Sequence, residues 1–224
     1  MKLVIAISKV SDGNMLIKSD KENPEVISNR KIFLEKNNID INQTTLVSTI
    51  YEGNDFCRYH EIGTNEKAAG MFDDKVLVAD ALVTKEMNHA LFLPIADCVG
   101  AVIYDTKKNI LMLTHLGRHA LEQNGGYKSV RYLIEDFGCK QSDLKVFLSP
   151  APGVESYPLY NFDNRSLKDV TIEQFESAGV TQKNINVNPA DTTKDTDYFS
   201  HSKFLKGNQQ TDGRFAIVAM MTNA

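Results

Sequence analysis

Three side chains that are able to do chemistry interrupt two apolar stretches in the middle of the chain. Asp97 and Cys98 break the apolar run over residues 90–104, and His115 ends the run that begins at residue 110. A polar group inside a buried strand must be hydrogen-bonded, coordinated or used, because leaving it without a partner costs about 1–3 kcal/mol. Cys98 and His115 are therefore the first candidates for a site. The alternative interpretation is structural: the cysteine would be a small core residue, and the histidine would be a hydrogen-bonded group at the end of a strand.

Two further basic side chains follow His115 closely, in the segment His-Leu-Gly-Arg-His. The glycine permits a turn and a close approach of the backbone. A strand that turns into a helix at this point can hold an anion at its amide groups. We therefore expect Arg118 and His119 to contact a substrate.

A second group of metal-ligand types lies in residues 54–75, where no regular pattern is visible. Cys57 and His60 have a C-x2-H spacing there. This spacing is a weak metal signature, because a structural zinc site needs four ligands and no second pair completes the set. The three cysteines, Cys57, Cys98 and Cys139, are odd in number and widely spaced, which predicts reduced thiols rather than a disulfide framework.

Composition and charge argue against several classes of function. The 224 residues are 42% hydrophobic and 24% charged, with a net charge of −4 and with acids and bases interspersed. Nothing in this balance suggests a nucleic-acid partner. No apolar run approaches the length of a membrane span, and residues 1–8 lack the length and cleavage signal of a secretory peptide. We expect one cytoplasmic domain over residues 1–224.

The elements that must position these side chains are an irregular mixture of strands and helices. Strands are predicted at residues 2–8, 15–18, 44–51, 76–83, 90–104, 110–114, 144–148, 185–187 and 215–220, the first two as a hairpin. One helix is predicted to begin at Asn23-Pro-Glu-Val, with Pro24 in its first turn, and to end in Lys36-Asn-Asn-Ile. Others are predicted over residues 120–137, with Gly138 as the cap, and over residues 165–178. This order favours an α/β protein of mixed α+β character, a mixed sheet with flanking helices, over a regular doubly wound sheet.

Several short motifs occur in order over nearly the whole chain. They are Asn23-Pro-Glu-Val-x-x-Asn29-Arg30, Asp80-Ala-Leu-Val-Thr, Ala96-Asp-Cys, His115-x-Gly, Ser149-Pro-x-x-Gly-x-x-x-Tyr157, Tyr198-Phe-Ser-His and Asp212-Gly-Arg214. This series resembles the YfiH-type laccase-domain family, also called multicopper polyphenol oxidoreductases. The resemblance implies a fold related to the cysteine-dependent toxin deamidases and a zinc site made by two histidines and one cysteine.

The same resemblance implies purine nucleosides as substrates. Members of the family cleave adenosine, inosine, guanosine or methylthioadenosine with phosphate, and deaminate adenosine. Copper, which the laccase name implies, is less expected than zinc, because a laccase needs many histidines for its several coppers and this chain has five.

By position, Cys98 and His115 match two of the family's zinc ligands, but the third position differs. Glu52 stands where the other histidine is expected, in Ile50-Tyr51-Glu52-Gly53. A carboxylate can ligate zinc, so the resemblance predicts a site of Glu52, Cys98 and His115, with His60 as an alternative third ligand.

A second departure follows His115. The tryptophan and arginine of the family's His-Ala-Gly-Trp-Arg-Gly motif are replaced by Arg118 and His119, which moves the cation one position earlier.

Three functions remain open. In the first, zinc on Cys98 and His115, with Glu52 as ligand or general base, activates water or orients phosphate for attack on a purine nucleoside. In the second, a zinc-free hydrolase or deamidase uses Cys98 as nucleophile and His115 as its base. In the third, a catalytically degenerate member binds a small molecule or a protein.

Two further residues have a catalytic or binding interpretation beside a structural one. Arg30 either supplies a donor to the substrate anion, as Arg118 and His119 would, or is a solvated helix position. Asp97 either shuttles protons as a second carboxylate or is a strand-end group that binds loop amides.

Overall fold

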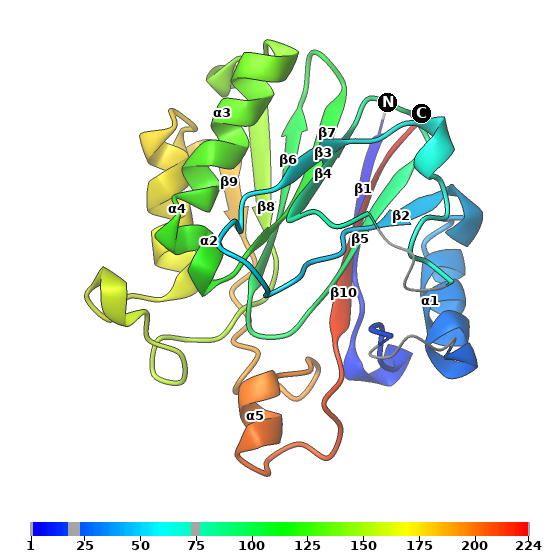
Figure 1. Ribbon diagram of the computed structural model, residues 1–224, viewed down its shortest axis with the longest axis vertical. Helices are drawn as coiled ribbons and strands as arrows, with labels where there is room; N and C mark the ends of the chain where they lie inside the picture. Colours follow the sequence, from blue (N-terminus) through cyan, green and yellow to red (C-terminus); the bar gives the residue numbers. More distant parts are fainter. Residues whose placement is uncertain (1, 18–22, 73–76, 224) are drawn as a thin grey trace.

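The apolar segments pair into two mixed β-sheets that pack face to face (Figure 1). The computed structural model describes residues 2–17, 23–72 and 77–223. Within them, one sheet has the order β1-β10-β5-β2 and the other the order β3-β4-β7-β6-β8-β9. The strands are Lys2–Ile7 (β1), Thr44–Leu46 (β2), Tyr59–Glu61 (β3), Ala81–Thr84 (β4), Ala90–Ile95 (β5), Val99–Asp105 (β6), Ile110–Leu116 (β7), Leu144–Leu148 (β8), Ile185–Val187 (β9) and Phe215–Thr222 (β10).

The α-helices lie around this pair of sheets. They are Pro24–Lys36 (α1), Arg118–Glu122 (α2), Gly125–Phe137 (α3), Leu167–Ser177 (α4) and His201–Leu205 (α5). Figure 1 shows α3 and α4 on the side of the six-stranded sheet and α1 on the side of the four-stranded sheet. The predicted mixed α+β fold with flanking helices is confirmed, with two sheets in place of one. No helix in the described ranges combines the length and hydropathy needed to cross a bilayer.

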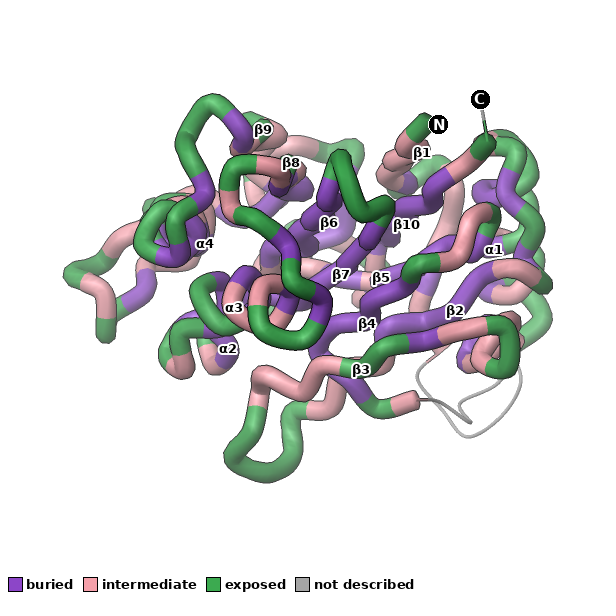
Figure 2. Tube along the Cα trace, turned by 90° about the horizontal axis from the view of Figure 1, so that it is seen from above, coloured by how far each residue is buried: buried purple, intermediate pink, exposed green. Residues whose placement is uncertain are grey.

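Three apolar layers hold the structure together, and β5 belongs to two of them. Leu91 and Leu93 face the six-stranded sheet, whereas Ala90 and Phe92 face α1. Because successive side chains of a strand point to opposite faces, a strand buried on both faces reads as a continuous apolar run. Figure 2 shows this burial along the central strands.

The strand predicted over residues 90–104 is two strands in different sheets. β5 ends at Ile95 and β6 begins at Val99, and Asp97 between them has a φ of 61°. This left-handed conformation turns the chain out of one sheet and into the other, and aspartate tolerates it better than most residues. Asp97 and Cys98 therefore lie at a corner between the sheets.

The predicted opening hairpin is wrong. β1 pairs antiparallel with β10, from Lys2 with Thr222 to Ile7 with Ile217. The Met15 amide donates to the carbonyl of Arg214, and residue 18 lies outside the described residues. Turn residues make a local hairpin plausible, but the long apolar β10 offers a deeper partner for β1.

Other boundaries differ by less. Thr44–Leu46 is the only strand in the stretch predicted over 44–51, β4 begins at Ala81, and Val76 lies outside the described residues. The helix predicted over 120–137 is α2 and α3, because Asn124 takes a φ of 59° between them. Gly138, with a φ of 62°, ends α3 as predicted.

Arg30 on α1 is part of the core. It is 1% exposed, and its guanidinium donates to the carbonyls of Met15, Gly70 and Met71 at 2.9, 3.0 and 2.8 Å. Its Cζ lies 5.7 Å from the centre of the Phe92 ring. The expectation of a solvated position is wrong, because Arg30 satisfies carbonyls of two loops that pack on α1.

We expect the Arg30→Ala variant to lose about 3 kcal/mol or more of unfolding free energy, because three carbonyls lose a donor and a cavity opens. Urea denaturation followed by circular dichroism measures this. Lys31→Ala is the matched control on the exposed face of α1 and should change stability by less than about 0.5 kcal/mol. A loss below about 1 kcal/mol in Arg30→Ala would contradict the structural role.

Candidate functional site

The antiparallel pairing of β6 with β7 brings Cys98 and His115 together. Gly100 pairs with His115 and Val99 with Leu116, so Cys98 comes opposite Gly117 just beyond the paired residues. A Cβ built on Gly117 would lie 3.1 Å from the Cys98 Sγ and 3.5 Å from the His115 Nε2. The thiol and the imidazole therefore face one common space, which is open because residue 117 has no side chain.

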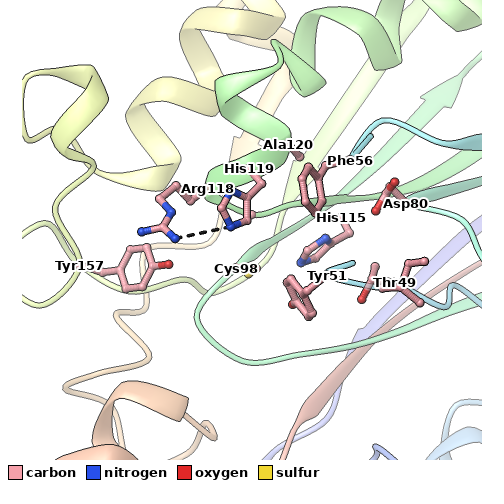
Figure 3. A pocket seen from close by; sticks show the side chains of 12 residues that line it. Thr49, Tyr51, Phe56, Asp80, Cys98, His115, Arg118, His119, Ala120 and Tyr157 are labelled. Carbon is pink, nitrogen blue, oxygen red and sulfur yellow. Dashed lines mark hydrogen bonds between the residues drawn. The ribbon is translucent and has the colours of Figure 1, made fainter. Parts of the chain in front are cut away.

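A cavity of about 200 Å³ contains this space (Figure 3). In the view of Figure 3, Tyr157 and Arg118 lie on one side of Cys98, and His115 and Tyr51 lie on the other. The full lining is Thr49, Ile50, Tyr51, Phe56, Asp80, Cys98, His115, Gly117, Arg118, His119, Ala120 and Tyr157. Four connecting segments, the end of β7 and the start of α2 thus meet at this cavity.

Burial keeps both candidate donors in their neutral forms. Desolvation, reinforced by the neighbouring carboxylate of Asp97, raises the pKa of the Cys98 thiol to about 12. Desolvation also lowers the pKa of His115 to about 4, against a smaller opposing effect of Asp80. Near neutral pH the pocket therefore presents a thiol and an uncharged imidazole rather than a thiolate–imidazolium pair.

Tyr51 covers this pair, and sequence reasoning missed it. Its ring meets the His115 ring edge to face, with centroids 6.2 Å apart and planes at 87°. Its hydroxyl donates to the Cys98 sulfur, and that neighbouring thiol is the main cause that raises the pKa of Tyr51. Tyr51 could have been found from its place next to Glu52, in the segment Ile50-Tyr51-Glu52-Gly53 that was predicted to supply the third zinc ligand.

Arg118 and His119, the predicted substrate contacts, lie at the pocket wall. The Arg118 Nη2 is 3.5 Å from the His119 Nε2. The His119 ring stacks on Phe56 at 4.8 Å between centroids, and its Nδ1 lies 3.4 Å from the Glu122 carboxylate. The structure therefore brings a guanidinium, an imidazole and an aromatic ring to the side of the cavity that Cys98 and His115 face.

A clamp behind the pocket fixes the loop that carries Tyr51. Arg58 donates to the Asp80 carboxylate from Nε at 2.7 Å and from Nη2 at 2.9 Å, and its Nη2 also donates to the Ile50 carbonyl at 3.0 Å. The His115 amide donates to the Asp80 carbonyl at 2.8 Å. One buried carboxylate residue thus joins the Tyr51 loop to the strand that carries His115.

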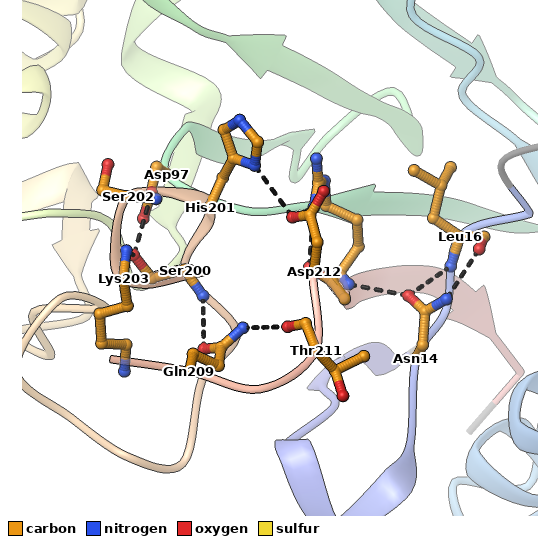
Figure 4. Close-up of polar contacts among 12 residues, drawn as sticks. Asn14, Leu16, Asp97, Ser200, His201, Ser202, Lys203, Gln209, Thr211 and Asp212 are labelled. Carbon is orange, nitrogen blue, oxygen red and sulfur yellow. Dashed lines mark hydrogen bonds and ion pairs between the residues drawn. The ribbon is translucent and has the colours of Figure 1, made fainter. Parts of the chain in front are cut away.

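Asp97 is engaged away from the cavity. It is 4% exposed and accepts a hydrogen bond from the Thr192 hydroxyl at 3.0 Å. It also accepts from the Ser200 hydroxyl at 3.0 Å and the Ser202 amide at 2.7 Å (Figure 4). It does not line the pocket. This geometry is that of a group that binds a loop, which was the structural alternative for Asp97.

The remaining sequence candidates lie apart from the pair. Glu52 is exposed and does not line the pocket, and His60 is exposed on β3. Arg30 is in the core on α1. The Cys57 Sγ lies 4.0 Å from the Ala120 carbonyl, and Cys139 is buried after α3.

These positions test how well a metal ion would fit. A thiolate sulfur and an imidazole nitrogen around one open space are the donors that zinc prefers. Glu52 does not complete the set, and among the described residues no three histidine, cysteine, aspartate or glutamate side chains are grouped to hold one ion. Two of the three predicted ligands, Cys98 and His115, therefore share one open space, and Glu52 lies outside it.

Two sequence comparisons identify proteins that are similar to this chain. A family model described as multi-copper polyphenol oxidoreductase laccase matches residues 6–162. The purine nucleoside phosphorylase CA_C1699 of Clostridium acetobutylicum is 27% identical over 108 residues, which are 48% of this chain and 42% of that protein. The purine nucleoside phosphorylase YlmD of Bacillus subtilis is 23% identical over 148 residues, which are 65% of this chain and 51% of that protein. The aligned regions thus cover about half the length of these curated relatives.

Solved structures show the same fold. The hypothetical protein YfiH of Bacillus licheniformis matches with a TM-score of 0.86 at 19% identity, over 98% of this chain and 93% of that one. The two-sheet arrangement with its flanking helices is therefore shared at a low level of sequence identity.

We expect the Gly117→Ala variant to fold normally and to bind zinc at least about tenfold more weakly than the unaltered chain. The φ of −89° at this residue suits alanine, but the new methyl group would enter the space between the Cys98 Sγ and the His115 Nε2. Zinc competition against a chromophoric chelator measures the affinity. Gly63→Ala, beside the flexible Glu86 side chain, is the control. Equal zinc affinity in the three proteins would show that this space is not where zinc binds.

Proposed function

This chain belongs to the multi-copper polyphenol oxidoreductase laccase family, and on that premise we propose that it processes purine nucleosides in the cavity around Cys98 and His115. The reaction we propose is phosphorolysis, with deamination of adenosine as a second reaction of the same pocket. The observation that carries the proposal is the convergence of a thiol, an imidazole, aromatic rings and a guanidinium on one small cavity. The names of the two curated relatives support the class of substrate.

The cavity favours binding of the reacting end of a nucleoside. At about 200 Å³ it is smaller than the roughly 300–1,000 Å³ that encloses a drug-sized ligand, so part of the substrate would remain at the opening. The Phe56, Tyr51 and Tyr157 rings offer faces and edges for a purine. Arg118 and His119 would hold the phosphate, because charge-assisted donors bind oxyanions well and Arg118 is exposed at the wall.

Zinc is the metal we propose for this pocket. Held by Cys98 and His115, it would supply Lewis-acid chemistry at the reacting end of the substrate. A set of several coppers suits the chain less well, because its five histidines are separated. Only His115 and His119 line the cavity, while His60 is on β3, His89 is buried beside Thr45 and His201 pairs with Asp212.

Two alternatives follow from specific observations. A metal-free Cys98 nucleophile with His115 as its base is disfavoured, because burial raises the thiol pKa and lowers the imidazole pKa, which opposes formation of the thiolate. A binding protein without catalysis is favoured by the exposure of Glu52, which leaves the predicted ligand set one member short. Small molecules remain the expected partners, and the reduced cysteines suit a cytoplasmic protein.

We expect the zinc-supplied chain to release free base from adenosine, inosine, guanosine or methylthioadenosine only when phosphate is present. Chromatography of the bases, together with an ammonia assay for deamination, measures both reactions. Cys98→Ala and His115→Ala should each lower the rate by at least about 100-fold, because both remove a donor from the reacting space. His60→Ala, on exposed β3, should leave the rate unchanged.

The result that would overturn the enzyme proposal is zinc-loaded protein with no base or ammonia release from any of the four nucleosides. Nucleoside binding without turnover, measured by calorimetry on the same sample, would instead establish the binding protein. Full activity in Cys98→Ala would show that the reaction does not take place in this cavity.

A further inference from the structure

We propose that the Tyr51 hydroxyl, rather than the Glu52 carboxylate, is the third protein donor of a divalent-cation site with Cys98 and His115. The inference rests on the cavity of the proposed function but not on its catalytic activity.

The first support is the position of the Tyr51 side chain. The ring is in edge-to-face contact with His115 at 6.2 Å, and the hydroxyl donates to the Cys98 sulfur. Tyr51 is thus in contact with both of the other donors at once. Although the residue is 66% exposed as a whole, it lines the cavity together with Cys98 and His115.

The second support is the place of Glu52. It is exposed and is absent from the cavity lining, although it is the next residue in the chain. The backbone that would have to rotate to bring it in is held one residue earlier, where the Arg58 guanidinium binds the Ile50 carbonyl and the Asp80 carboxylate. The clamp therefore directs Tyr51, and not Glu52, toward Cys98.

The third support is the chemistry of the donors. One sulfur, one nitrogen and one oxygen around a common space suit a borderline divalent cation of the zinc class, whereas Mg²⁺ and Ca²⁺ prefer oxygen ligands alone. On binding, the thiol and the phenol each give up a proton to solvent, and the two anions balance the charge of the cation. The neutral imidazole of His115 completes the set, and a fourth position is left for water or substrate.

The metals alone test this assignment, with no nucleoside present. Co²⁺ is titrated into the full chain while its visible absorption and its thiolate charge-transfer band are followed, and Zn²⁺ is titrated while the ultraviolet difference band of tyrosinate is followed. Tyr51→Phe keeps the ring against His115 and removes only the oxygen. Glu52→Gln, one residue along, is the matched control.

We expect Tyr51→Phe to bind Co²⁺ at least about tenfold more weakly than the unaltered chain and to lose the tyrosinate band, since one of three protein ligands is gone. Glu52→Gln should bind within about twofold of the unaltered chain and keep the band. Cys98→Ala should lose the charge-transfer band. Thermal unfolding of each variant without metal confirms that it folds.

Three outcomes would overturn the assignment. They are a loss of affinity in Glu52→Gln but not in Tyr51→Phe, zinc binding without a tyrosinate band, and no Co²⁺ binding by the unaltered chain. This experiment does not measure turnover, so it is independent of the proposed function. Metal binding that depends on Tyr51, in a protein that does not act on nucleosides, would confirm Tyr51 as a ligand and contradict the proposed function. Turnover together with metal binding that is unchanged in Tyr51→Phe would support the proposed function and contradict the assignment of Tyr51.

Discussion

The register between β6 and β7 is the constraint on which the site depends. Leu111, Leu113 and His115 follow one another on the face of β7 that meets the four-stranded sheet, and the two leucines belong to the core between the sheets. His115 is thus the polar end of an apolar face. Because side chains alternate along a strand, a shift of one residue would turn His115 toward the helices and leave Cys98 without its neighbour. The packing of the two sheets therefore sets the chemistry at their edge.

Much of the local structure can be read from the sequence, because its causes are local. Asn23 and Pro24 begin α1, the apolar segments of β8 and β9 have the predicted bounds, and Cys98 and His115 attract attention as polar groups in apolar strands. Long-range pairing has no such signal, so the partner of β1 was misjudged. Tyr51 was missed for a different reason. Its loop has no alternation of apolar and polar residues that would show which side chain points inward. The orientation of the loop depends instead on Arg58, which binds the Ile50 carbonyl and belongs to none of the motifs.

The segment after β9 holds two walls of the cavity in place. Asp191 accepts from the Gly153 amide, at the start of the loop that leads to Tyr157, and Thr192 donates to Asp97 at the corner before Cys98. Asp191 and Thr192 thus fix both loops. The buried carboxylate of Asp97, which accepts from three donors, tolerates little movement, because each lost partner leaves charge unsatisfied. The long polar stretch between β9 and β10 is therefore a framework for the site.

The central position of β10 has a consequence for the way the molecule forms. This strand lies between β1 and β5 and pairs with both, so the two earlier strands meet their common neighbour only after most of the chain has been synthesised. Until then β5 has an open apolar edge on the ribosome, where it is liable to pair with other chains. Contacts between such distant segments also slow the search for the native state. The four-stranded sheet therefore closes late.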